Sequence, residues 1–174
     1  DARLFILDPM PNSHGLGDEI FKRMIWGVRK LREKSQAPIL LVESSSTCDS
    51  VFKPDLYRKY RAGDAVLRKA YQHLLSEGVK HLYYLSHQEL GLGEDSWIEG
   101  VHPNDLGNRE YADAYKKKLK EILSEDAPNP RYMPTRQFRD GSYDWTLRHN
   151  EVMRQNRTTD PEILMIGNSI THGW

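Results

Sequence analysis

The sequence predicts an α/β fold in which helices flank a parallel β-sheet. Three observations support this class: predicted strands and helices alternate along the first 125 residues, the strands are continuous apolar runs, and each helix is long enough to cross between parallel strands. Continuous rather than alternating apolar runs are typical of a sheet covered on both faces. With 174 residues, of which 38% are hydrophobic, the chain can form one or two compact domains.

The predicted strands are short apolar runs bounded by turn residues. The first strand covers 4–7 and ends at Asp8, the second covers 39–42, and the third covers 81–85. Each of them runs into a polar loop. In open α/β sheets the functional groups lie beyond the carboxyl ends of the strands, so these loops are expected to carry the site.

Three amphipathic helices are predicted, at 18–35, 56–77 and 105–124. Their apolar residues recur at helical spacing: Ile20, Met24, Val28 and Leu31, then Val66, Leu67, Ala70, Tyr71, Leu74 and Leu75, then Ala112, Tyr115, Leu119 and Ile122. The lysines of the third helix lie largely on its other side and are interpreted as a solvated face: Lys116, Lys117, Lys118 and Lys120.

A second unit is expected after these elements. Residues 126–134 are interpreted as a linker, and a short helix is expected around 145–155. A further apolar strand, 163–166, then leads into Gly167-Asn168-Ser169.

Charge and cysteine content exclude several classes of function. Lysine and arginine number 25, as do aspartate and glutamate, so no broad attraction to nucleic acid or to an anionic membrane is expected, and a small neutral substrate fits better. The single Cys48 excludes a disulfide framework and a thiolate metal cluster. No apolar run approaches the roughly 20 residues that span a bilayer.

Metal binding is not expected either, because four histidines show no metal-ligand spacing and are interpreted as surface or loop residues: His14, His73, His81 and His87. The chain begins at Asp1 and ends at Trp174 within a motif, so it is expected to be a segment of a longer protein. Localisation stays open, with export to the periplasm or the medium as the guess.

Residues capable of chemistry gather in three places beyond predicted strands. Ser169 directly follows an apolar strand and is flanked by glycine, so it is a candidate nucleophile, although it could instead cap a helix. Glu99 stands three residues before His102, a spacing that lets one loop supply a general base and its orienting carboxylate; a capping or surface role is the alternative. Asn12 could donate to an oxyanion or hold a turn.

Together these segments resemble the SGNH/GDSL hydrolases. Ile166-Gly167-Asn168-Ser169-Ile170-Thr171 is similar to their nucleophile block, Glu99-Gly100-Val101-His102-Pro103-Asn104-Asp105-Leu106-Gly107 is similar to their histidine block, and Pro11-Asn12 resembles the block that supplies the oxyanion-hole asparagine.

This resemblance implies a flavodoxin-like three-layer fold and ester hydrolysis. Ser169 would attack the carbonyl, His102 would move the proton, Glu99 would orient the imidazole, and Asn12 would hold the oxyanion. The implied substrate is a small-molecule or carbohydrate ester, with O-acetyl groups as one option, and no metal or organic cofactor is implied.

Two departures from the family pattern matter. Glu99 stands where the family has aspartate, so Asp95 is a second candidate acid, and a non-catalytic binding module on the same fold is the alternative function. Ser169 follows His102, which reverses the usual order of the blocks.

The reversed order favours a tandem arrangement over a circular permutation. Residues 1–125 would then be the later two-thirds of one domain, and residues 135–174, after the linker at 126–134, would begin a second. On this interpretation Ser169 and His102 belong to different sites.

Overall fold

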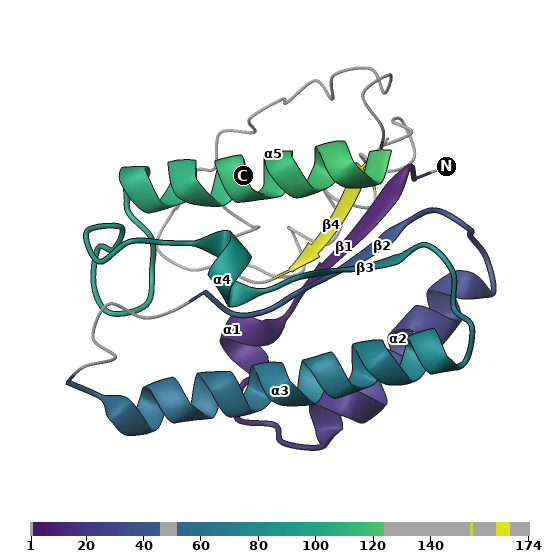
Figure 1. Ribbon diagram of the computed structural model, residues 1–174, viewed down its shortest axis with the longest axis horizontal. Helices are drawn as coiled ribbons and strands as arrows, with labels where there is room; N and C mark the ends of the chain where they lie inside the picture. Colours follow the sequence, from purple (N-terminus) through teal and green to yellow (C-terminus); the bar gives the residue numbers. More distant parts are fainter. Residues whose placement is uncertain (1, 46–51, 124–153, 155–162, 168–174) are drawn as a thin grey trace.

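The computed structural model describes residues 2–45, 52–123, 154 and 163–167. It confirms the α/β class with a four-stranded sheet of order β3-β2-β1-β4 (Figure 1). The strands are β1 (Leu4–Asp8), β2 (Ile39–Val42), β3 (Leu82–Leu85) and β4 (Ile163–Gly167). All three pairings are parallel, so the carboxyl ends of the four strands meet at one edge of the sheet.

Five helices surround this sheet within the described residues: α1 (Met10–Ser13), α2 (Glu19–Arg32), α3 (Pro54–Ser76), α4 (His87–Leu90) and α5 (Asp105–Leu123). Figure 1 shows α2 and α3 on one face and α5 on the other. The three long helices confirm the expected crossovers and give the three-layer arrangement. None of the helices in the described ranges combines the length and apolarity that crossing a bilayer requires.

The strands are buried because alternate side chains enter two different cores. Phe5 and Leu7 of β1 pack with α2 and α3, whereas Leu4 and Ile6 pack with Tyr111 and other residues of the α5 side. A strand with helices on both faces needs apolar side chains at every position. This explains why β1 and β2 are continuous apolar runs rather than alternating ones.

The two short helices differ from the expectation of loops after the first and third strands. Asn12 lies in α1, which has Pro11 in its first turn. In α4, Ser86 forms a capping box with Glu89, and Gly91 ends the helix with φ 65°. Four residues are too few to show an apolar stripe, which is why only their caps could have revealed them. The expected linker at 126–134 lies outside the described residues, as does the helix at 145–155 apart from residue 154.

Candidate active site

The Glu99 and His102 side chains lie in direct contact in the loop between α4 and α5. Glu99 Oε1 faces His102 Nδ1, and their side chains are 52% and 55% exposed. The hydrogen bond from His102 lowers the pKa of Glu99, which keeps the carboxylate ionised beside the ring. A carboxylate at Nδ1 holds the proton there and leaves Nε2 free to accept one.

This pair sits at the tip of a narrow antiparallel turn. Trp97 and Pro103 form a β-bridge, and the Ile98 amide donates to the His102 carbonyl at 2.8 Å. The bridge brings together two limbs of the turn, residues 95–98 before the tip and residues 102–104 after it. The chain must therefore reverse between Ile98 and His102. The short tip that results holds Glu99 and His102 on adjacent limbs.

The base of the turn is tied to α5 by side chains. Asn104 Nδ2 donates to the Asp95 carbonyl at 2.7 Å and to the Trp97 carbonyl at 3.3 Å. Asn104 Oδ1 accepts from the Gly107 amide at 3.0 Å, as a helix N-cap does. Glu110 accepts from the Ser96 hydroxyl at 2.5 Å. The turn is therefore anchored to the first two turns of α5.

Asp95, the other candidate acid, contributes its backbone to this anchor, because its carbonyl oxygen accepts from Asn104. Glu99 is the carboxylate that the structure brings to His102.

Asn12 occupies a different part of the same edge. Asn12 is exposed, and its backbone N–H donates to the Pro9 carbonyl at 3.2 Å at the start of α1. The helix α1 packs against α3, where Gly63 permits close approach: a Cβ there would lie 2.9 Å from His14 Cα. Asn12 therefore belongs to the α3 side of the sheet, while the Glu99–His102 turn leads into α5.

Ser169 lies outside the described residues, but the strand before it is placed. The β4 strand pairs with β1 along its whole length, with Leu4 opposite Ile163 and Asp8 opposite Gly167. The β4 strand therefore joins the same sheet, and its carboxyl end lies at the edge that holds α1 and the loops after β2 and β3.

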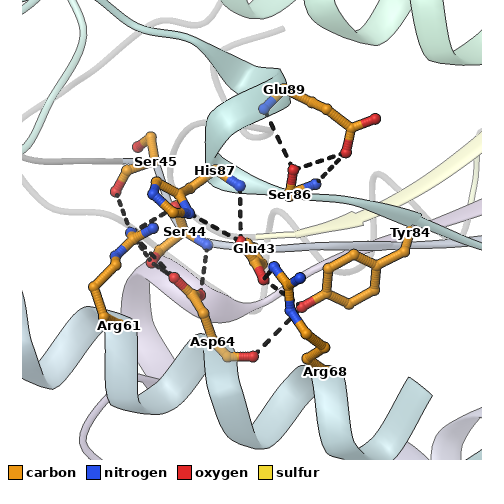
Figure 2. Close-up of polar contacts among 10 residues, drawn as sticks. All are labelled: Glu43, Ser44, Ser45, Arg61, Asp64, Arg68, Tyr84, Ser86, His87 and Glu89. Carbon is orange, nitrogen blue, oxygen red and sulfur yellow. Dashed lines mark hydrogen bonds and ion pairs between the residues drawn. The ribbon is translucent and has the colours of Figure 1, made fainter. Parts of the chain in front are cut away.

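A second polar cluster, not predicted from the sequence, lies where β2 ends (Figure 2). Glu43 accepts from the Tyr84 hydroxyl at 2.6 Å and from Arg68 at 2.7 Å through Oε1, and from the His87 amide at 2.8 Å through Oε2. His87 Nδ1 also lies 3.2 Å from Oε2. The interpretation of His87 as a surface or loop residue was wrong: it is the first residue of α4, its side chain is 20% exposed, and its ring lies against a carboxylate that is 1% exposed.

Asp64 of α3 completes this cluster. It accepts from the Ser44 amide at 2.9 Å and pairs with Arg61 Nη2 at 3.0 Å. Burial raises the pKa of Asp64 to about 6, against the lowering effect of Ser44 and Arg61. Asp64 lies on the buried stripe of α3 between Tyr60 and Leu67. A carboxylate at an apolar helical position was therefore the one feature of the sequence that could have indicated this cluster.

Glu43, Asp64 and His87 each offer a ligand atom, and these atoms lie within 4.8 Å of one another. Burial acts to raise the pKa of Glu43, but the bonds from Tyr84, His87 and Arg68 prevail and lower it. Burial, followed by the charge of Arg61, lowers the pKa of His87, which favours the neutral ring beside Glu43. Two arginines already compensate the carboxylates, so a metal ion would have to displace them. We therefore interpret the cluster as a structural one that holds the end of β2 against α3 and α4.

Asp8 is the buried carboxyl group at the end of β1. It is 2% exposed and accepts from the Tyr115 hydroxyl at 3.0 Å. Burial raises the pKa of Asp8 to about 7, although the bond from Tyr115 acts to lower it. The group lies opposite Gly167, the last residue of the strand that leads to Ser169.

The fold agrees with that of a known protein family. The GDSL-like Lipase/Acylhydrolase family profile matches residues 1–120. A crystal structure from Bacteroides ovatus ATCC 8483, named as a GDSL-like lipase, is similar with a TM-score of 0.65 and 30% identity over 71% of this chain and 36% of that chain. The chain thus spans about a third of the length of that protein. A search of curated proteins gave no significant match. Since the family profile covers 120 of the 174 residues, the chain belongs to the GDSL-like lipase/acylhydrolase family.

Proposed function

We propose that this chain carries the base and orienting acid of a serine esterase, His102 and Glu99, and that within these 174 residues Ser169 is the nucleophile that acts with them. The observation that carries the proposal is the contact between Glu99 and His102 on an anchored turn at the carboxyl edge of the sheet. With the proton held at Nδ1, His102 Nε2 can take the hydroxyl proton of serine as it attacks the ester carbonyl. The same proton then passes to the leaving alcohol.

The position of β4 supports Ser169 as the partner of His102. Gly167 lies opposite Asp8, and Ser169 is two residues further along the chain. Two residues of extended chain reach about 7 Å, so Ser169 would remain near the carboxyl edge. Asn12, exposed at the same edge, would donate its side-chain amide to the oxyanion together with the serine amide.

For the substrate we propose a small neutral ester, with carbohydrate O-acetyl groups as the leading class. The balanced charge of the chain favours an uncharged alcohol over nucleic acid or an anionic lipid surface.

The test combines hydrolysis of a chromogenic acetyl ester with labelling by a fluorophosphonate, which marks activated serines. In the 174-residue chain Ser169→Ala should remove the label, and Ser169→Ala and His102→Ala should each reduce hydrolysis by a factor of roughly 10³ or more. Matched controls on α3 are Ser76→Ala and His73→Ala, which should change neither readout. Label on a serine other than Ser169, or hydrolysis that survives His102→Ala, would contradict the proposal.

A further inference from the structure

The side chain of Asn104 links the first limb of the anchored turn to the helix behind it. Asn104 donates its amide to the Asp95 and Trp97 carbonyls on the first limb, and its oxygen accepts from Gly107 in α5. Its own backbone amide donates to the Ser96 carbonyl at 3.0 Å. The Glu99–His102 pair extends from this junction.

We propose that Asn104 is a positioning residue that sets the geometry of the Glu99–His102 pair, and through it the rate of ester hydrolysis. The inference rests on the proposed function for its effect on rate, but not for its effect on the pair. Glu99 and His102 are exposed, with side chains 52% and 55% accessible, so surrounding packing holds them only weakly. Their relative position therefore depends on the backbone of the two limbs, which Asn104 joins.

The two functions of the Asn104 side chain can be separated by substitution. Serine is as good an N-cap as asparagine, so Asn104→Ser keeps an acceptor for the Gly107 amide. It removes the two amide donors to Asp95 and Trp97 and introduces no charge beside Glu99. Asn104→Ala removes both the cap and the donors. The matched control is Asn108→Ser, the same substitution at an exposed position of the same helix.

The first measurement is the imidazole tautomer of His102, read from ¹⁵N spectra. The wild type and Asn108→Ser should hold the proton at Nδ1, because Glu99 accepts it there. Asn104→Ser should give a mixture of tautomers, as Glu99→Gln also should, while its melting temperature stays close to that of the wild type. Asn104→Ala should show the same mixture with a lower melting temperature.

The second measurement is the kinetics of acetyl ester hydrolysis. Asn104→Ser should lower kcat by roughly 10- to 100-fold, because misplacement on the scale of 1 Å has effects of that size. KM should change little, because the turn is proposed to move a proton and not to bind the substrate. A merely structural role would be rescued by the serine cap, whereas a positioning role is not.

The two measurements distinguish failure of this inference from failure of the proposed function. An Asn104→Ser variant with the wild-type tautomer overturns the positioning role, whatever the activity. A mixed tautomer with unchanged kcat also overturns it, because the pairing would then not limit the reaction. If the wild type itself lacks ester hydrolysis, the proposed function fails, and the tautomer alone decides whether Asn104 positions the pair.

Discussion

At the scale of single residues, the acid of the candidate site differs from the family pattern by one methylene. The structure brings Glu99, rather than Asp95, to His102 Nδ1. A longer side chain can make this contact because both residues lie at the tip of a turn, where neither is held by a core. The turn therefore tolerates glutamate where a packed site would not.

The first prediction concerns this choice of acid. Glu99→Gln should lower kcat by roughly 10²- to 10⁴-fold, because the amide no longer fixes the Nδ1–H tautomer. Asp95→Asn should leave kcat within about twofold, since the backbone carbonyl of Asp95 makes the contact that matters. Steady-state kinetics with the acetyl ester give both values. The reverse pattern, a silent Glu99→Gln and a severe Asp95→Asn, would assign the acid to Asp95.

The second prediction concerns Asp8, whose pKa in the folded chain is raised from 3.8 to about 7, mainly by burial. Between these two values the folded state binds the proton more tightly than the unfolded state does. Stability should therefore fall as the pH rises from about 4 to about 7, by an amount on the order of 4 kcal/mol for this group alone.

Urea unfolding of the wild type and of Asp8→Asn across this pH range isolates the contribution. Asparagine keeps an acceptor for the Tyr115 hydroxyl but does not titrate, so the difference between the two curves should shrink or change sign as the pH rises. Asp64, with its pKa raised to about 6, leaves a smaller slope of the same sign in both proteins. A constant difference between pH 4 and pH 8 would show that Asp8 is ionised in the folded state.

At the scale of elements, the sequence alone predicted the helices and strands whose patterns extend over many residues. The apolar stripes of α2, α3 and α5 span many turns, and the runs of β1 and β2 are unbroken, so their class and order were predictable. The Glu99–His102 pair was also predictable, because three residues of sequence separation keep the two groups close. The cluster of Glu43, Asp64 and His87 was not, because its members come from the residue after β2, from α3 and from α4, and meet only through the sheet topology.

Lys118 is a smaller example of the same limit. It was expected on a solvated face, yet its side chain is only 15% exposed and pairs with Glu89 of α4 at 2.7 Å. Helical periodicity gives the direction of a side chain but not the neighbouring element that approaches it.

The third prediction tests how closely α5 packs on the histidine turn. A Cβ at Gly107 would overlap the Ser96 carbonyl oxygen and lie 2.8 Å from Pro103 Cβ. Gly107→Ala should therefore destabilise the chain by roughly 2–4 kcal/mol and disturb the turn, because both obstacles are held by backbone. Gly27→Ala, in open space on α2, is the control and should stabilise by roughly 0.5–1 kcal/mol. Chemical unfolding of both variants checks the contrast, and equal effects would contradict the packing.

At the scale of the whole molecule, the edge strand beside β1 comes from a part of the chain that is distant in sequence. The β4 strand occupies the side of β1 that β2 leaves open, with five residues in register. That side of β1 can pair with only one strand. Under the predicted tandem division, with a boundary at 126–134, a serine-bearing strand ahead of Asp1 would compete with β4 for the position beside β1.

The last prediction compares the 174-residue chain with one extended ahead of Asp1. In the 174-residue chain the amides of β4 should be protected from hydrogen exchange, and hydrolysis should be weak but dependent on both Ser169 and His102. If the added segment supplies a strand with a shorter connection to β1 than that of β4, this strand should take the place beside β1, because closing a shorter connection loses less chain entropy. Ser169→Ala should then leave the hydrolysis that depends on His102 intact. If Ser169→Ala abolishes that hydrolysis in both proteins, Ser169 and His102 form one rearranged site, and the division into two domains is wrong.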